Sequence, residues 1–222
     1  IKEIMVNIDD VYQKVLTFAN KEQRGYITPQ EFNLFANQAQ KEIFEQYFYD
    51  LNQFSRAPGS SNEYSDIVDN INEKIAIFET TGTGLTLASD LYRLGTVSVN
   101  GNEIEEVQPN ELLYMNNSAI SRPTNGRRVY VRRGNAIIVT PITTNPDYTY
   151  TKLPKKPTWG YVVVGTKALY DNGTSVNFEL HPAEETELVY KILKYAGLSM
   201  KRDDIAKGGQ GLESLLTQQE KQ

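Results

Sequence analysis

The sequence predicts an α+β fold: an N-terminal helical bundle completed by a late helix, a central antiparallel β insertion and an extended C-terminal tail. Apolar residues recur with a helical period in the first third of the 222-residue chain, the period then becomes β-like, and helical spacing returns near the end. We therefore expect a helical platform over 1–80, a β-rich insertion over 81–180, a helix that packs back on the platform over 181–207, and a flexible or partner-docked tail over 208–222.

The first two helices are predicted by their apolar residues and by one start signal. The first helix has an amphipathic stripe made of Ile8, Val11, Tyr12, Val15, Leu16 and Ala19. The second should begin with a capping box, because Thr28 can cap, Pro29 suits the first helical turn and Glu31 stands three residues after the cap. Its apolar residues cover much of its circumference, so we expect it to be central: Phe32, Phe35, Ala36, Ala39, Ile43, Phe44, Tyr47, Phe48 and Leu51.

The segment between these helices has the length of a calcium-binding loop. Arg24 stands at a position where such a loop needs an oxygen ligand, so we expect a helix–turn–helix corner at Gly25 and no metal. A break at 58–61 should end the second helix, and a third helix is expected from about Glu63 to Phe78.

Strand signals begin after an expected loop at 80–84. Residues 91–99 and 102–107 should form a hairpin around Asn100-Gly101, because this dipeptide suits a tight hairpin turn. A short helix is expected over 109–115. A second hairpin should pair 129–131 with 136–139.

The region that follows is rich in proline. Four prolines fall within 141–158, so we expect an extended segment that cannot lie in a central strand throughout. Strands are expected over 159–164 and 176–180, joined by a turn at 171–173. The late helix should begin near Pro182 and end before Gly197.

The formal charge of −5 conceals a strong asymmetry along the chain. Residues 1–121 carry 8 basic and 18 acidic side chains, residues 122–167 carry 9 and 1, and residues 168–222 carry 6 and 9. The three net charges are therefore −10, +8 and −3. Such patterning concerns partners and association rather than the fold.

The composition leaves little for catalysis. The chain has no cysteine, which removes disulfides, thiolate metal sites and cysteine nucleophiles. Its one histidine, His181, precedes Pro182 and is expected to start the late helix rather than act as a base. Adjacent acids such as Glu184-Glu185 are expected on solvated faces. We therefore expect no enzyme, no metal and no cofactor, and no apolar run approaches the roughly 18 residues of a membrane span.

The basic segment is the most informative functional signal. It contains Arg122, Arg127, Arg128, Arg132, Arg133, Lys152, Lys155 and Lys156, with aromatic residues interleaved. This mixture fits a protein interface that meets an acidic surface. It also fits contact with nucleic-acid backbone and bases, or hairpins whose charged edges resist aggregation. The residues leave these three interpretations open.

Several stretches of the chain together point to a family. They are 20–33, which includes Gly25-Tyr26-Ile27-Thr28-Pro29, and 39–50, 91–94, 129–131, 137–141, 155–159, 177–180 and 184–197. This succession resembles virion structural proteins of tailed bacteriophages, including crAss-like and related short-tailed phages, and spans most of residues 10–220.

The resemblance implies a neck or head–tail connector subunit, an adaptor or ring protein beneath the portal. Such subunits assemble as rings, commonly dodecamers, around the channel through which DNA passes. The resemblance thus implies a virion location, self-association, contacts with the portal and with other neck and tail proteins, non-specific contact with genomic DNA, and no membrane. The alternative is a phage nucleic-acid-binding protein that uses residues 122–167 directly.

Overall fold

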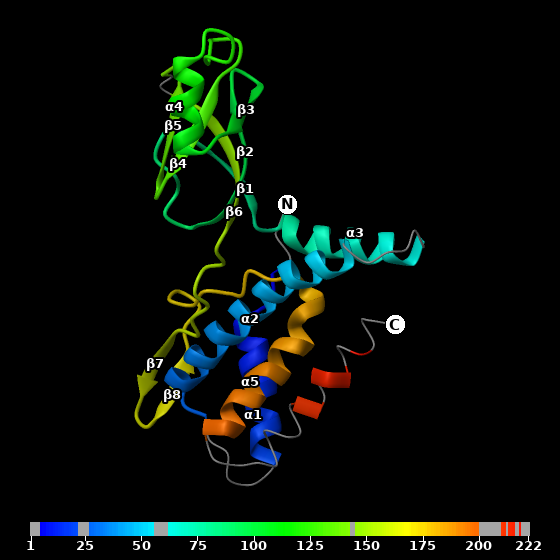
Figure 1. Ribbon diagram of the computed structural model, residues 1–222. Helices are drawn as coiled ribbons and strands as arrows, with labels where there is room; N and C mark the ends of the chain where they lie inside the picture. Colours follow the sequence, from blue (N-terminus) through cyan, green and yellow to red (C-terminus); the bar gives the residue numbers. More distant parts are fainter. Residues whose placement is uncertain are drawn as a thin grey trace. The chain divides into compact units, whose positions relative to one another are not determined.

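The computed structural model describes residues 5–21, 27–55, 62–142, 145–199, 210–211, 213–215 and 218, and it confirms the α+β class. The chain divides into two compact units (Figure 1). We call residues 1–77 and 154–222 the helical unit, and residues 78–153 the sheet unit. The expected turn at Gly25, the break at 58–61, the segment 200–207 and most of the expected tail lie outside the described residues.

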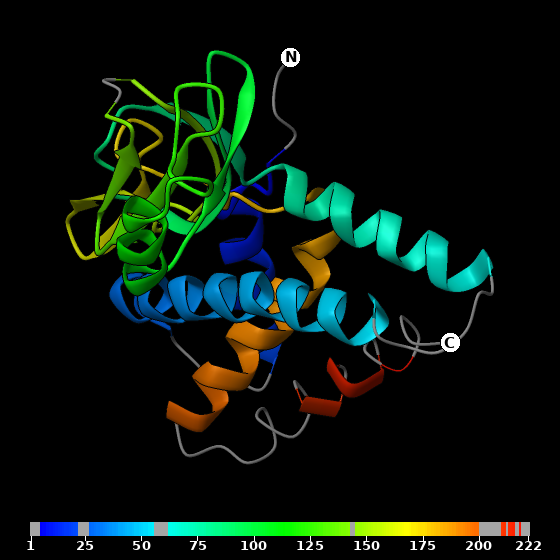
Figure 2. The same cartoon turned by 45° about the horizontal axis from the view of Figure 1, so that its top comes forward.

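The helical unit is built on four α-helices of the described chain. They are α1 (Ile8–Lys21), α2 (Pro29–Ser55), α3 (Asn62–Ala76) and α5 (Glu185–Ser199), with the short 3₁₀ helix η1 (Pro182–Glu184) leading into α5. α5 packs against both α1 and α2, and α3 packs against α2. Figure 2 shows α2 (blue) crossing α5 (orange) obliquely. The late helix thus completes the N-terminal bundle.

The sequence at the start of α2 explains why the helix begins there. Glu31 N–H donates to Thr28 Oγ1 at 3.3 Å, and Thr28 N–H donates to Glu31 Oε2 at 3.0 Å, which is a capping box with Pro29 at the first helical position. The pKa of the exposed Glu31 carboxyl is lowered by its side-chain and backbone hydrogen bonds to Thr28. Phe32 and Phe44 are fully buried, as expected for a central helix.

The segment before η1 is joined to the start of α1 by two hydrogen bonds. Phe178 N–H donates to the carbonyl of Val6, and Ile8 N–H donates to Asn177 Oδ1, so the segment before η1 lies beside the start of α1.

The expectation that Gly197 follows the end of the late helix is wrong, because α5 continues to Ser199. Gly197 is buried within the helix.

The helical unit also holds a two-stranded sheet. β7 (Tyr161–Val164) pairs with β8 (Lys167–Tyr170) around a turn in which Gly165 has a φ of 65°. We expected the 159–164 strand to pair after a turn at 171–173, and this is wrong, because the chain reverses earlier. Only an isolated bridge links Thr158 to Val176. Both strands belong to the helical unit, whereas the expected insertion over 81–180 includes them.

The sheet unit contains six strands in the order β1-β6-β2-β3-β4-β5. Their bounds are β1 (Glu79–Thr83), β2 (Leu91–Val99), β3 (Asn102–Glu106), β4 (Val129–Arg133), β5 (Ala136–Thr140) and β6 (Asp147–Lys152), with α4 (Pro109–Asn117) after β3. All neighbours pair antiparallel except β3 and β4, which are parallel. The insertion is therefore not purely antiparallel, because α4 and the loop after it give the chain the length that a crossover needs.

The sheet curls, and its core lies inside the curl. The segment after β1 reaches β5, where Leu87 N–H donates to the carbonyl of Asn135 and Ile137 N–H donates to the carbonyl of Leu85. These bonds cover part of the outer edge of β5. The buried core consists of Leu87, Val97, Val99, Ile104, Tyr130, Ile137, Val139, Tyr148 and Tyr150.

Two of the six strands were not predicted. We expected a loop at 80–84, where β1 now lies, and only an irregular extended segment at 141–158, where β6 occupies a position between β1 and β2. The four prolines flank β6 instead of interrupting it, so no backbone donor is missing from the strand. Gly82 suits β1 because a Cβ at this position would lie 2.5 Å from the ring of Tyr148.

Candidate functional site

The predicted basic residues are divided between the two units. Arg122, Arg127, Arg128, Arg132, Arg133 and Lys152 belong to the sheet unit, whereas Lys155 and Lys156 belong to the helical unit. Arg132 and Arg133 are exposed at the end of β4, beside the turn to β5. Arg127 and Arg122 are exposed in the loop between α4 and β4.

Acidic side chains accompany the basic ones in the sheet unit. Glu103 and Glu105 of β3 line one small cavity together with Arg127 and Arg128. Arg128 is half-buried, and its Nη2 donates to Asn125 Oδ1 at 3.4 Å. Residues 78–153 carry 7 basic and 7 acidic side chains, so the net charge of the sheet unit is zero. The strongly basic run of the sequence is thus largely balanced within its own folded unit.

Lys155 has a structural partner in the helical unit. Its N–H donates to Glu179 Oε2 at 2.8 Å, and its ammonium lies 3.7 Å from Glu179 Oε1. The buried amide of Gln40 completes the cluster, because its Nε2 donates to the carbonyl of Lys155 at 2.7 Å and its Oε1 accepts from Glu179 N–H at 3.1 Å. This network holds the proline-flanked connector on α2. The sequence analysis did not predict that Gln40 and Glu179 meet, since they are 139 residues apart and no local pattern pairs them.

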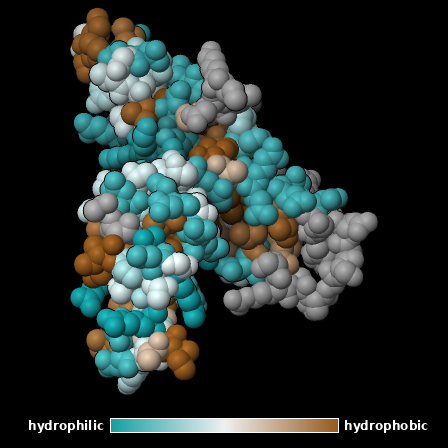
Figure 3. Space-filling view, turned by 90° about the horizontal axis from the view of Figure 1, so that it is seen from above, coloured by the Kyte–Doolittle hydropathy of each residue, from teal (hydrophilic) through white to brown (hydrophobic). Residues whose placement is uncertain are grey.

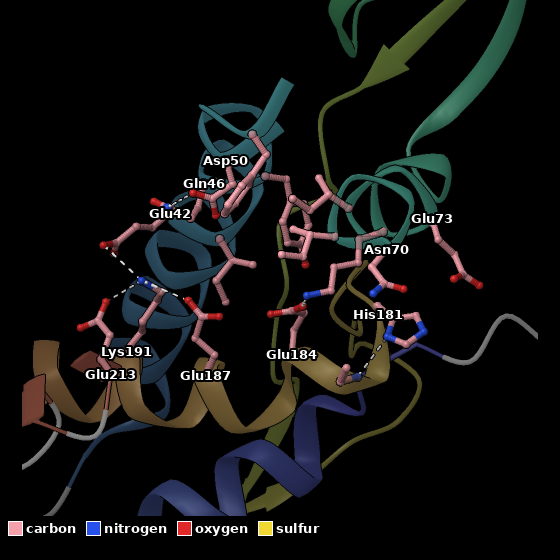
Figure 4. Close-up of a pocket in the computed structure, with 17 residues that line it drawn as sticks. Glu42, Gln46, Asp50, Asn70, Glu73, His181, Glu184, Glu187, Lys191 and Glu213 are labelled. Atoms are coloured by element: carbon pink, nitrogen blue, oxygen red, sulfur yellow. Dashed lines mark hydrogen bonds and ion pairs between the residues drawn. The ribbon is translucent and has the colours of Figure 1, made fainter. Parts of the chain in front are cut away.

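A cavity of about 540 Å³ lies among α2, α3, η1 and α5 (Figure 4). Its lining includes the buried apolar side chains of Ile43, Tyr47 and Ile71. Its charged lining has six carboxylates and two ammonium groups, from Glu42, Asp50, Glu73, Glu184, Glu187, Glu213, Lys74 and Lys191. The volume falls in the range of pockets that take a small molecule or several side chains.

A buried lysine organises one wall of this cavity. Lys191 Nζ lies 2.6 Å from Glu213 Oε1, 3.3 Å from Glu187 Oε1 and 3.4 Å from Glu42 Oε1 (Figure 4). Burial opposes the charged form, but the hydrogen bond to Glu213 and the nearby carboxylates outweigh it and raise the pKa of the Lys191 ammonium. Lys191 therefore stays charged and ties α5 to α2 and to the C-terminal segment at Glu213.

Two further groups beside Lys191, the Glu213 carboxyl and the Tyr195 phenol, also have shifted pKa values. Burial opposes ionisation of Glu213, but its hydrogen bonds to Lys191 and Lys194 prevail and lower the pKa of its carboxyl. Burial and the hydrogen bond that Tyr195 Oη donates to Glu42 raise the pKa of Tyr195 to about 12. Of this cluster, the sequence reveals only the i, i+4 spacing of Glu187 and Lys191.

The opposite wall contains a second ion pair. Lys74 Nζ of α3 lies 2.6 Å from Glu184 Oε1, and the Glu184 side chain is buried. The expectation that Glu184 lies on a solvated face is wrong, because an ammonium group from α3 compensates its burial. His181 behaves as expected: its Nδ1 accepts a hydrogen bond from Ala183 N–H at 3.2 Å, so it caps η1.

Chemically, the cavity favours cations and apolar groups over anions. Most of its carboxylates already form ion pairs or hydrogen bonds within the chain. Among the described residues, no group of three His, Cys, Asp or Glu side chains is arranged to hold a metal ion.

No protein-family model matches the chain, and no curated protein matches it either. The site must therefore be interpreted from its own residues. None of the helices in the described ranges combines the length and apolar character needed to cross a bilayer.

Large apolar side chains are exposed in both units. In the sheet unit they are Leu113, Tyr114 and Ile120, on and just after α4. In the helical unit they include Val162, Val163, Val164 and Leu169 of the β7–β8 hairpin. In the face that Figure 3 displays, hydrophobic side chains (brown) form several separate areas among hydrophilic ones (teal). Exposed apolar clusters of this kind are typical of contact surfaces for other proteins.

Proposed function

We propose that this chain is a structural subunit of a tailed-phage virion. It forms a ring in the neck, joins the portal to the tail, and surrounds the DNA channel. The proposal assigns no catalytic step and no cofactor to the chain. It rests on the sequence resemblance and on the surfaces described above.

The observation that carries the proposal is that each unit exposes its own apolar surface. Ile120 in the sheet unit is 96% exposed, and Val163 in the helical unit is 62% exposed. The two surfaces differ in residues and in secondary structure, so they are not copies of one self-complementary patch. Closed rings form through contacts between two different patches of the same subunit. Two unlike apolar surfaces therefore favour a ring over a two-fold dimer.

The charges support the same proposal. The helical unit carries 16 basic and 21 acidic side chains, a net charge of −5, while the sheet unit is neutral but has exposed arginines at one hairpin end. An acidic surface in one subunit and arginines in another can orient neighbours. In the ring, Arg132 and Arg133 face an acidic neighbour.

The test is the mass of the full chain in solution and in particles. Native mass spectrometry and negative-stain imaging should find closed rings, and a dodecamer would have twelve times the 25.2 kDa of one chain. Purified virions that contain the protein should show it in the neck. A chain that stays monomeric at all concentrations and is absent from virions contradicts the proposal.

The alternative, a nucleic-acid-binding protein, predicts a different result from the same arginines. Changing Arg127, Arg128, Arg132 and Arg133 to Glu would then abolish DNA binding, and the wild-type affinity would fall steeply with salt. Under our proposal the same change impairs ring assembly. The balanced charge of the sheet unit favours the assembly role.

A further inference from the structure

One face of the β7–β8 hairpin presents three exposed apolar side chains and one lysine. Val162 is directly opposite Leu169, and Val164 is directly opposite Lys167, so these four side chains share a face. The three apolar ones are each more than half exposed. A two-stranded hairpin with no cover is marginal in water, so this face has the properties of a contact surface.

The base of the hairpin, in contrast, is firmly attached. Tyr161 and Tyr170 of the opposite face lie against Trp159, with ring centroids 5.8 Å apart in both cases. Trp159 is buried, its Nε1 donates to Asp9 Oδ1 at 2.9 Å, and its N–H donates to Asn33 Oδ1 at 2.7 Å. The base of the hairpin is therefore fixed, while apolar side chains near its tip are exposed on both faces, including Val163 on the face of the two tyrosines.

The cavity among α2, α3 and α5 has complementary properties. Its lining includes buried apolar side chains such as Ile71, and its carboxylates outnumber its ammonium groups by six to two. Glu73 is exposed at this cavity, where a cation from outside can reach it. Residues 161–170 carry one charged side chain, Lys167, which lies next to the turn. The hairpin tip thus combines valine side chains, which suit the apolar lining, with the Lys167 ammonium, which suits the carboxylates.

The hairpin and the cavity lie at different ends of α2. Asn33 binds the hairpin base, whereas Tyr47 and Asp50 line the cavity. The nearest lining residue of α2, Glu42, stands nine residues after Asn33, which is about 13.5 Å along the helix at 1.5 Å per residue. Figure 1 shows β7–β8 and α3 at opposite ends of α2. A hairpin therefore cannot fill the cavity of its own chain without leaving its base, but it can reach that of a second copy.

We propose that the β7–β8 hairpin of one copy docks in the cavity among α2, α3 and α5 of the next copy. Val164 then contacts the apolar lining near Ile71, and Lys167 pairs with Glu73. Because two different patches meet, the contact propagates from subunit to subunit and suits a ring. This inference rests on the proposed function and identifies one contact within the proposed ring.

Cysteine cross-linking tests the contact directly, because the natural chain has no cysteine. A chain with Val164→Cys is mixed with a chain with Asn70→Cys, which lies in the cavity lining. We expect a disulfide between the two variants under mild oxidation, with native mass confirming folded chains. The matched control pairs Asn70→Cys with Ile142→Cys, an 88% exposed position of the sheet unit, and should not cross-link. Cross-linking of Val164→Cys with itself alone would mean that hairpins pair with each other, which overturns the proposal.

A charge exchange gives an independent measurement. Lys167→Glu should weaken self-association about tenfold or more, since like charges then meet in the contact. Adding chains with Glu73→Lys should restore binding to the Lys167→Glu chains. If wild-type chains form rings while neither variant changes assembly and no cross-link forms, the docking is wrong and the proposed function stands. If wild-type chains never associate, the proposed function itself fails.

Discussion

Two hairpins with similar local sequences have opposite environments. β4–β5 and β7–β8 are both rich in β-branched residues and both turn through a glycine with positive φ, Gly134 at 57° and Gly165 at 65°. In β4–β5, Val129, Val131, Ile137 and Val139 are buried. In β7–β8 the valines are exposed.

The difference lies in what surrounds each hairpin. β4 pairs with β3, and the β5 region exchanges backbone hydrogen bonds with Leu85 and Leu87. Ile137 and Val139 belong to the core inside the curl, while Val129 and Val131 pack with Leu112 and Met115 of α4 on the other face. β7–β8 has only Trp159 at its base and no third strand in the described part of the chain. Local sequence therefore specifies a hairpin in both cases, but tertiary context decides whether its apolar face contributes to folding or remains for a partner.

The largest effect should come from truncating the buried hairpin. Ile137→Ala should lower the free energy of unfolding of the sheet unit by about 2–5 kcal/mol, because Ile137 is fully buried in its core. The adjacent Ile138 points to the other face of β5 and is 41% exposed. Ile138→Ala should cost less than about 1 kcal/mol. Urea unfolding followed by circular dichroism measures both.

An equivalent truncation in β7–β8 should have a different effect from the one in β4–β5. Leu169→Ala should leave the unfolding free energy of the helical unit almost unchanged, since Leu169 is more than half exposed. Its loss should instead appear in self-association. Equal destabilisation by Ile137→Ala and Leu169→Ala would mean that both hairpins are part of a folding core.

A smaller effect should come from the two turn glycines. An alanine Cβ would meet no atom within 4 Å at Gly134 or at Gly165, so each substitution tests backbone strain alone. Holding alanine at positive φ costs about 1–2 kcal/mol. For Gly134→Ala this should lower the stability of the whole sheet unit, because β4–β5 is joined to neighbouring strands.

For Gly165→Ala the expected result is local. The strained β7–β8 hairpin can open without disrupting the helices, so amide hydrogen exchange should rise at 161–170 alone. Exchange that rises throughout the helical unit would show that the hairpin is coupled to the bundle.

Short local sequence patterns were sufficient to predict some elements of the fold. The capping box at Thr28 and Glu31 and the turn at Asn100-Gly101 each fix a short-range geometry, and the structure has both. β1 was missed because its Thr-Gly-Thr-Gly pattern is typical of a loop, and the need for Gly82 arises only from the ring of Tyr148. That reason is a tertiary contact, which no local pattern contains.

The candidate site was harder to predict for the same reason. Glu42, Lys191 and Glu213 meet from three distant parts of the chain, and only the folded bundle brings them together. The basic segment was visible in the sequence, but the acidic residues that neutralise its charge within the sheet unit were not. Glu103 and Glu105 lie some twenty residues earlier, and parallel pairing of β3 with β4 brings them to the same cavity as Arg127 and Arg128.

The smallest effects concern two tyrosines, one in each unit. Burial and the neighbouring Glu106 raise the pKa of Tyr130 on β4 to about 12, and burial with the Glu42 hydrogen bond does the same for Tyr195 on α5. A raised pKa means that the folded state favours the neutral phenol. The stability that this provides is complete below the ordinary tyrosine pKa of about 10 and is lost as the pH rises through about 12.

Substituting each tyrosine should therefore change the loss of stability at alkaline pH in one unit only. Tyr130→Phe should reduce the loss of sheet-unit stability between pH 10 and about 12, since no phenol remains to ionise there. Tyr195→Phe should do so for the helical unit only. Ultraviolet titration at 295 nm should lose one late-ionising tyrosine in each variant. If a single substitution changes the alkaline stability of both units, their stabilities are coupled. The effects of substitutions in the two hairpins would then have to be assigned to the whole chain rather than to one unit.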